Sequence, residues 1–380
     1  MSAPADLAQV LGDIAAHAAA HDADGSFPFE AFPPLWELGV LNLTIPTSLG
    51  GAGSGLAVCT EVVSSIGEAD PCVALIVAQH LTAHNTLRHL AWPEAVREMV
   101  QQSSVDGVAL INSLRVEPDM GTPARGGRPA TTARRLPDGG GWMINGRKIY
   151  STGIPLLRWM LVWAATDDVE PLVGAFLAEA GTPGYAVERS WEALGMRATR
   201  SDDVVFTDLV VPLDHAVDVM SPQQRAAAID PNFVIWNAVL MASVYHGVAR
   251  AARDWLATYL NERVPANLGA PLASLPRFHE AFGAIQAQVA MSDRLLRSTA
   301  EDVDGGLDPL AAAAEANLVK RAVTNAAVDV VLGAVRLVGN PGLSASHPLE
   351  RHLRNVLHGP VHTPQDDMIV TATGRAALLR

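Results

Sequence analysis

The feature that most constrains the fold is a change in hydrophobic periodicity that occurs twice along the chain. Over residues 1–112, apolar residues recur at helical spacing, as at Leu7, Val10, Leu11 and Ile14. Residues 113–225 instead hold short alternating runs separated by glycine and proline, at 131–133, 142–144, 160–165, 172–177, 185–187 and 204–211. Helical spacing returns over 226–380. The sequence therefore predicts an α+β chain that is mainly α, with a small β-domain between two helical domains.

Composition and charge limit the partners that such a chain can have. Its 380 residues are 49% hydrophobic, which permits a large core divided among two or three domains. Lys and Arg total 27 against 40 Asp and Glu, and the net charge of −13 argues against nucleic acid or an anionic membrane as partner. The two cysteines are too few for a disulfide framework, and neither a secretory signal nor a membrane-spanning apolar run is visible. A cytoplasmic protein is the simplest expectation.

The N-terminal domain contains two histidines with helical spacing. Helices are expected over 61–69 and 71–81, broken at Asp70 and Pro71. If the second helix continues, His80 and His84 lie on one face of it. With no third ligand close in sequence, we expect no metal site. The rings are either satisfied polar groups within the domain or part of an active site.

A glycine-rich segment in the β-domain, residues 142–153, combines a turn signal with β-forming residues. Asn145 and Gly146 favour a two-residue hairpin turn, since both tolerate positive φ. After this turn, residues 148–152 alternate and predict a strand. In the C-terminal domain, residues 311–338 carry an apolar stripe at helical spacing. That stripe is typical of the core of a helical bundle or of a helix between subunits.

Five motifs resemble the acyl-CoA dehydrogenase superfamily and follow its order along the chain. They are the stretch 32–53, the loop 113–121, the segment 145–152, the stretch 191–212 and the segment 347–355, and the helix end 259–263 matches one further position. The resemblance implies an N-terminal helical domain over 1–112, a middle β-barrel domain over 113–225 and a C-terminal four-helix bundle over 226–380. It also implies a flavin, a homotetramer or at least a dimer, and a small-molecule substrate.

The resemblance assigns cofactor contacts residue by residue. Tyr150 would flank the flavin ring, and Ser151 and Thr152 would lie near its reactive edge. The other contacts that it implies are Ser113, Val116, Arg263, Arg336 and Gln365. Two of these positions depart from the family pattern, because Val116 replaces a threonine and Arg336 stands where a glutamine is usual. FAD is the expected cofactor, and FMN supplied in reduced form is the alternative.

The carboxylate that an acyl-CoA dehydrogenase needs to remove a proton is missing by gapless alignment. Thr363 falls on the position of the usual glutamate, and a threonine cannot serve as that base. The alternative position on an earlier helix holds Asn237, and Ala238 replaces the neighbouring arginine. A register shift that brings Asp366 or Asp367 into place is the open alternative.

The flavin monooxygenase branch of the superfamily, which includes dibenzothiophene monooxygenase and sugar nitrososynthases, needs no such base. It takes reduced flavin from a separate reductase and transfers one oxygen atom from O2, so it needs neutral donors and a dry pocket. By resemblance to that branch, the catalytic residues are His80, His84, Asn112, Ser151 and His362, with His358 as the alternative to the last. We expect one of the two C-terminal histidines to face the flavin, and no carboxylate to reach the substrate.

Three functions remain open at this point. We favour a reduced-flavin monooxygenase acting on a small organic substrate. The first alternative is an FAD-dependent acyl-CoA dehydrogenase, and the second is a catalytically silent member that only binds flavin or another ligand.

Overall fold

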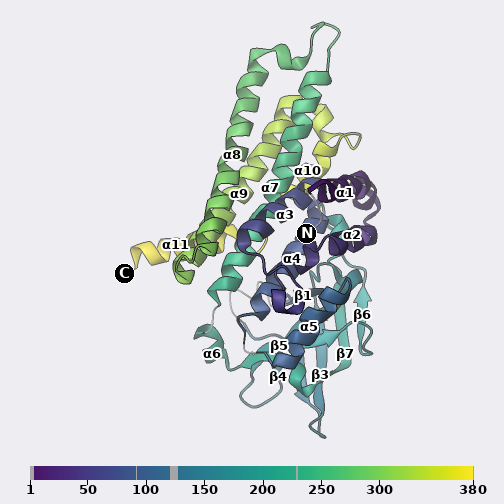
Figure 1. Ribbon diagram of the computed structural model, residues 1–380, viewed down its shortest axis with the longest axis vertical. Helices are drawn as coiled ribbons and strands as arrows, with labels where there is room; N and C mark the ends of the chain where they lie inside the picture. The colour runs from purple at the N-terminus through teal and green to yellow at the C-terminus, as the bar shows by residue number, and fades with distance from the viewer. Residues whose placement is uncertain (1–3, 91, 120–126, 228–229, 380) are drawn as a thin grey trace.

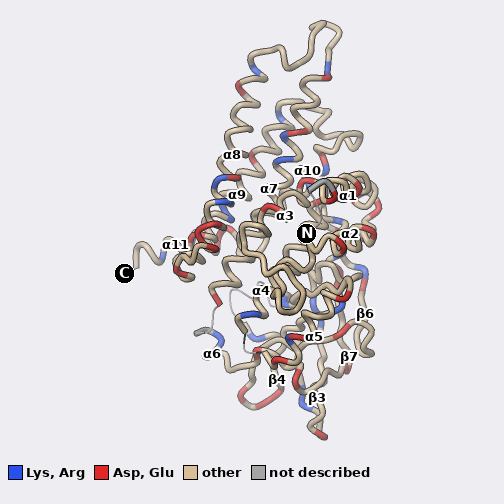
Figure 2. The backbone as a smooth tube through the Cα atoms, viewed as in Figure 1, with Lys and Arg blue, Asp and Glu red and all other residues tan. Residues whose placement is uncertain are grey.

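The computed structural model describes residues 4–90, 92–119, 127–227 and 230–379. Two helical parts and one sheet make up the molecule (Figure 1). The sheet lies at one end, and the long C-terminal helices extend away from it. This confirms the mainly helical α+β fold. Acidic and basic residues are interspersed along the helices and the strands (Figure 2).

Five helices form the N-terminal part. They are α1 Pro4–Asp24, α2 Phe32–Glu37, α3 Leu56–Ala69, α4 Pro71–Leu87 and α5 Glu94–Asp106. As expected, the chain breaks between α3 and α4 at Asp70, whose carboxylate accepts from the Cys72 backbone N–H at 2.7 Å. That bond caps α4 at its N-terminus, next to a proline at the first helical position. Helix α4 runs beyond the expected end and includes His84.

The middle part is one eight-stranded sheet with the order β6-β7-β3-β2-β4-β5-β8, and β1 pairs in parallel with β4. The strands are β1 Leu110–Leu114, β2 Thr132–Arg135, β3 Gly141–Lys148, β4 Leu157–Thr166, β5 Val173–Glu179, β6 Tyr185–Glu188, β7 Asp203–Pro212 and β8 Ala216–Met220. In the described residues, β6 and β8 each have one strand partner. Strand β1 crosses the expected domain boundary at 112–113, so the first domain is joined to the sheet by pairing.

The expected hairpin turn at Asn145 and Gly146 is wrong. Both residues lie inside β3, which continues through a register irregularity between Ile144 and Gly146 where it pairs with β7. A Cβ on Gly146 would lie 2.5 Å from Thr131 Oγ1, so the glycine permits a close approach of the chain rather than a turn. The Asn145 amide nitrogen donates to Asp208 Oδ1 at 3.1 Å on the neighbouring strand.

A buried ion pair anchors the end of β3. Lys148 Nζ lies 2.6 Å from Glu117 Oε1, and neither side chain is exposed by more than 3%. The same carboxylate accepts from the backbone N–H groups of Ala130 and Thr131 at 2.6 and 3.0 Å. These extra donors satisfy the carboxylate, which offsets the cost of removing two charges from water. The ion pair therefore holds in place the start of the segment that follows Lys148.

The C-terminal part contains three long helices and two shorter ones. They are α7 Pro231–Glu262, α8 Pro276–Asp304, α9 Pro309–Val338, α10 Pro348–Val356 and α11 Asp366–Leu378, preceded by the short α6 Pro222–Ala227. The Asp304 carboxylate accepts from the Leu56 and Ala57 backbone N–H groups at 2.7 and 2.9 Å. The last turn of α8 therefore caps α3 and joins the bundle to the N-terminal helices.

Helix α7 passes through the centre of the molecule. A Cβ on Gly247 would lie 2.4 Å from Ser64 O, and one on Gly67 would lie 2.6 Å from Val244 O, so the backbones of α3 and α7 touch. Among the described residues, α7 alone is long and apolar enough to cross a bilayer by length and composition. Because 78% of its most apolar window is buried inside the protein, its composition is that of a core helix.

Candidate functional site

The segment after β3 is a loop, and the strand expected over 148–152 is wrong. Strand β3 ends at Lys148, and Tyr150 adopts a left-handed φ of 57° with 59% of its surface exposed. The backbone N–H of Ile149 donates to Val116 O at 2.9 Å, and that of Ser151 donates to Asp202 O at 3.3 Å. Two loops hold this segment in place of a strand partner, and the Tyr150 ring projects from the surface.

Ser151 has a hydroxyl for which the described residues supply no partner. The side chain is 1% exposed, and its Oγ is buried without a hydrogen bond. A buried polar group left unpaired costs about 1–3 kcal/mol, so a hydroxyl in this state fits a ligand-facing role. The Thr152 hydroxyl, by contrast, lies 2.9 Å from Ser201 Oγ. The two neighbouring hydroxyls are thus distinct, and only Ser151 has its hydrogen-bonding capacity open.

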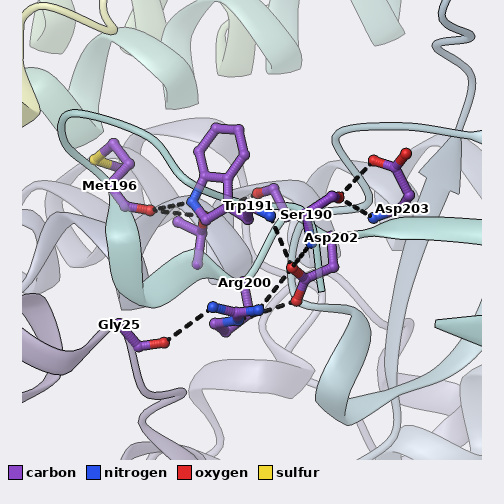
Figure 3. Close-up of polar contacts among 9 residues, drawn as sticks. Gly25, Ser190, Trp191, Met196, Arg200, Asp202 and Asp203 are labelled. Atoms are coloured by element: carbon purple, nitrogen blue, oxygen red, sulfur yellow. Dashed lines mark hydrogen bonds and ion pairs between the residues drawn. The ribbon is translucent and has the colours of Figure 1, made fainter. Parts of the chain in front are cut away.

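The loop that supports this segment is fixed by a buried ion pair (Figure 3). Arg200 Nε and Nη2 donate to the two oxygens of Asp202 at 3.0 and 2.7 Å. Oδ1 of the same carboxylate accepts from the backbone N–H groups of Ser190 and Trp191 at 3.0 and 2.9 Å. Because Arg200 donates to both oxygens of Asp202, this bidentate pair is stronger than a single ion contact. It therefore positions Trp191.

Trp191 connects the β-domain loop to the C-terminal part. Its ring centroid lies 6.0 Å from that of Tyr150 and 6.2 Å from that of His358, and its indole Nε1 donates to Met196 O at 2.9 Å. Three rings from distant segments therefore lie side by side. Trp191 lies inside a recognised motif, but the sequence offers no local signal that its ring contacts the other two.

One of the C-terminal histidines, His362, faces a buried tyrosine from α7. His362 Nδ1 lies 2.6 Å from the Tyr245 hydroxyl oxygen, and the His358 and His362 ring centroids are 6.4 Å apart. Burial, with the neighbouring His358 and Lys320 adding to it, lowers the pKa of His362 to about 3. Burial also lowers the pKa of His358 and raises that of Tyr245. All three groups are therefore neutral near pH 7. Sequence reasoning missed Tyr245, which looks like any apolar-face residue of a core helix.

The two positions at which the resemblance would put a catalytic carboxylate lie side by side, and neither holds one. The Asn237 amide nitrogen donates to Thr363 O at 3.0 Å, so these two residues are adjacent. Asp366, the candidate for a register shift, turns instead to α9. Its Oδ2 accepts from Asn325 Nδ2 at 2.6 Å, and its Oδ1 lies 3.7 Å from Lys320 Nζ. Asp367 lies in the first turn of α11 and is exposed.

Asn112 joins three elements beside the loop. Its amide nitrogen donates to Gln79 Oε1 at 2.7 Å on α4 and to Thr152 O at 3.0 Å. Its side-chain oxygen accepts from the Ser113 backbone N–H at 2.7 Å. The structure thus brings Asn112 and Ser113 to the segment that carries Ser151.

His80 and His84 lie on one face of α4, as the spacing predicts, but both are completely buried. Their ring centroids are 4.5 Å apart. His80 Nε2 lies 2.9 Å from Leu41 O, and its Nδ1 accepts from the Ile111 backbone N–H at 3.3 Å. With both nitrogens occupied and its pKa lowered by burial to about 4, the neutral His80 ring supports β1. His84 Nε2 lies 3.1 Å from Ser104 Oγ, and its Nδ1 is buried without a partner.

The two candidate phosphate-binding arginines, Arg263 and Arg336, lie away from the loop that carries Ser151. Arg263 directly follows α7, and the connection from α7 to α8 lies at the end of the bundle farthest from the sheet (Figure 1). Arg336 lines a groove of about 490 Å³ between α8 and α9. Val116 forms an isolated bridge with Ile149, and Gln365 precedes α11. No group of three potential metal-ligating side chains occurs in the described ranges.

Three family models match successive parts of the chain. They are the acyl-CoA dehydrogenase N-terminal domain over residues 9–102, the middle domain over 116–209 and the C-terminal domain over 239–366. The fold and these three domain matches define a protein of the acyl-CoA dehydrogenase class. The chain belongs to the acyl-CoA dehydrogenase family, whose members are flavin-dependent oxidoreductases.

Relatives within this family carry different activities. A putative acyl-CoA dehydrogenase, YdbM of Bacillus subtilis (strain 168), is 30% identical over 96% of this chain and 93% of that protein. The L-evernosamine nitrososynthase of Micromonospora sp. is 28% identical over 94% and 85%. The structure of KijD3 in complex with FMN and an amino-keto dTDP-sugar has a TM-score of 0.84 at 27% identity and covers 100% of this chain and 95% of that one. Membership of the family therefore leaves the reaction open.

Proposed function

We propose that this chain is a flavin-dependent monooxygenase that receives reduced flavin and acts on a small organic substrate. The observation that carries the proposal is the pairing of Asn237 with Thr363, where the two alternative carboxylates of the family's dehydrogenases would lie. Asp366 is held against α9 by Asn325. A site without a carboxylate base cannot remove a substrate α-proton in the dehydrogenase manner.

The residues of this site fit a flavin. The buried, unpartnered Ser151 hydroxyl is available to donate to a group at the loop, and the exposed Tyr150 ring offers a flat apolar surface. Thr152, Ser113, Val116 and Gln365 would complete the contacts with the ring system. Arg263 and Arg336 lie away from this loop in the same chain, so they would contact the phosphate of a flavin held at the loop of a second copy. A bound reduced flavin supplies the electrons that activate O2. FAD and FMN both remain candidates, and KijD3 is one relative known with FMN.

The chain's own side chains then have distinct roles. Ser151 donates a hydrogen bond to the oxygen that is being activated. Tyr245 keeps its proton, because burial raises its pKa, and can donate to His362 Nδ1. That bond leaves Nε2–H of the neutral ring as a donor to the substrate side. The rings of Trp191 and His358 shield one side of the site from water, which strengthens these hydrogen bonds. Asn112 positions the loop, with His80 and His84 supporting it from α4.

Rapid mixing tests this reaction. Anaerobic protein loaded with reduced flavin, then mixed with O2, is expected to show a transient absorbance before oxidised flavin appears. Oxidised flavin bound to the protein should not lose its absorbance band when acyl-CoA thioesters are added without O2. Bleaching by a thioester would support the FAD-dependent acyl-CoA dehydrogenase, the second candidate, which the similarity to YdbM favours. Failure to bind flavin in either redox state would support the silent member.

Assembly is a separate proposal, and we expect a homotetramer or at least a dimer. Large apolar side chains are exposed on α8 and α9, namely Met291 at 64%, Leu295 at 37%, Leu310 at 73% and Leu318 at 44%. The groove that contains Arg336 lies between the same helices. A second copy covering this face would remove that apolar surface from water. Light scattering should give a multiple of 40.1 kDa, and the monomer mass alone at micromolar concentration would contradict the proposal.

Two further proposals concern the compartment of the protein and the source of its reduced flavin. Both cysteines, Cys59 and Cys72, are buried free thiols, which agrees with a cytoplasmic protein. A separate flavin reductase is the proposed source of reduced flavin. The proposal includes neither a nucleic acid nor a membrane as partner.

A further inference from the structure

Arg115 is a half-buried arginine whose charge is not matched by a carboxylate of its own. It follows β1 directly and precedes Val116, which bridges to Ile149 at the start of the proposed flavin loop. Its guanidinium carbon lies 4.5 Å from the centroid of the Trp163 ring and 5.9 Å from that of Phe233. The guanidinium therefore lies between the sheet and the first turn of α7, beside the proposed site.

The charge of Arg115 has no counter-ion of its own. Within the described residues no carboxylate lies at ion-pair distance from it, and the residues outside those ranges include no Asp or Glu. The acidic group that acts on it is Asp218, and that carboxylate pairs with Arg225, whose Nη1 lies 2.5 Å from Asp218 Oδ2. Arg225 also lies over Trp163, at 5.0 Å. Two guanidinium groups thus share one carboxylate, and one positive charge remains.

Burial makes this excess charge costly. The Nε atom of Arg115 is buried and has no hydrogen-bond partner in the described part of the chain. Burial, together with repulsion from Arg225, lowers the pKa of Arg115 to about 10, so the group is still charged at neutral pH. The terminal nitrogens form no hydrogen bond with the described residues, and the residue as a whole is half-buried. Its donors are therefore unused within the described part of the chain.

Arg158, on strand β4 of the same sheet, is an arginine whose ring stacking is explained by the fold. The Arg158 guanidinium lies 5.5 Å from the Trp159 ring centroid, and its Nη2 lies 3.1 Å from Glu179 Oε1. That arginine combines ring stacking with its own carboxylate at an exposed position. Arg115 has the stack without the carboxylate, although it is less exposed. Stacking therefore accounts for the orientation of Arg115 but leaves its charge unmatched.

We propose that Arg115 binds an oxyanion group of the substrate, either a carboxylate or a phosphate. A guanidinium offers paired, coplanar donors that match two oxygens of either group. Because Arg115 comes two residues after Ser113 and one before Val116, an anion bound there lies at the edge of the proposed flavin site. The reactive part of the same molecule could then lie against the loop that carries Ser151. The link to a substrate rests on the proposed function, but the anion site does not.

Calorimetric titration of the flavin-free chain tests the anion site apart from any oxygen chemistry. Inorganic phosphate and benzoate are the two probes, used separately in a buffer without other oxyanions. At least one of them is expected to bind, and Arg115→Met should weaken that binding about tenfold or more, the loss of a charge-assisted contact. Arg115→Lys should restore part of it. The matched control Arg158→Met should leave binding unchanged. Whichever probe binds more tightly identifies the group as phosphate or carboxylate.

Each outcome has a definite meaning. Failure of both probes to bind the unaltered chain, or equal binding by the Arg115→Met variant, overturns the proposal. Circular dichroism shows whether that variant is folded, and Arg115→Gln, which keeps a polar side chain, serves if it is not. Because flavin and O2 are absent from the titration, a negative result leaves the proposed monooxygenase standing. A missing absorbance transient would likewise leave the anion site standing.

Discussion

Replacing Ser151 by alanine is expected to shorten the lifetime of the transient absorbance about a hundredfold, while flavin affinity changes by less than about threefold. Removal of one preorganised donor at a developing charge typically costs 10²–10³ in rate, because a site without water has no substitute for it. The Ser151 hydroxyl is the candidate donor, since it is buried and has no partner in the described residues. Stopped-flow absorbance gives the lifetime, and fluorescence titration gives the flavin affinity.

Ser243→Ala is the matched control for this substitution. Ser243 is equally buried, but its hydroxyl donates to Val239 O at 2.8 Å inside α7 and so already has a partner. Its replacement should leave the transient unchanged. If Ser151→Ala weakens flavin binding as much as it shortens the transient, its hydroxyl is a ground-state contact only.

Replacing Asp202 by alanine is expected to lower the free energy of unfolding by about 3–5 kcal/mol, because it leaves the buried Arg200 guanidinium without its partner. Asp202 is 2% exposed and Arg200 is 8% exposed. The substitution also removes the acceptor for the Ser190 and Trp191 N–H groups (Figure 3). Urea unfolding followed by circular dichroism measures the loss.

The neighbouring Asp203 provides the comparison. It pairs with Arg147 at 2.7 Å, but that arginine is 39% exposed, so water can replace the partner. Asp203→Ala should therefore cost clearly less, on the order of 1 kcal/mol for an exposed ion pair. Equal losses for the two variants would show that burial of the Arg200–Asp202 pair does not set its contribution.

Local pattern was sufficient to predict many of the helices and strands. The helical spacing of 311–338 became α9, Pro309–Val338, and the break at Asp70 became a capped helix start. Alternation likewise located β4, β5 and β7, whose residues pack in the core. These features depend on residues within about two turns or one strand of each other, so the order of residues already contains them.

Local pattern misled where a distant segment changes the backbone. Asn145 and Gly146 form a turn signal, but pairing with β7 and close approach of Thr131 keep them inside a strand. The spacing of His80 and His84 correctly placed both rings on one face. That face points into the core, because α4 packs against β1. Periodicity identifies which residues share a face but does not identify what covers it.

The sequence by itself determined the family, the order of the helical and β-rich parts of the chain, and the absence of glutamate at position 363. Only the tertiary structure decided which polar groups are left without partners. Tyr245 and His362 are 117 residues apart in the chain, and their contact exists because α7 and the C-terminal loop pack together. Ser151 and Arg115 are notable for partners that they lack. Whether a hydroxyl or a cation is satisfied depends on every element packed around it, and no local pattern records that sum.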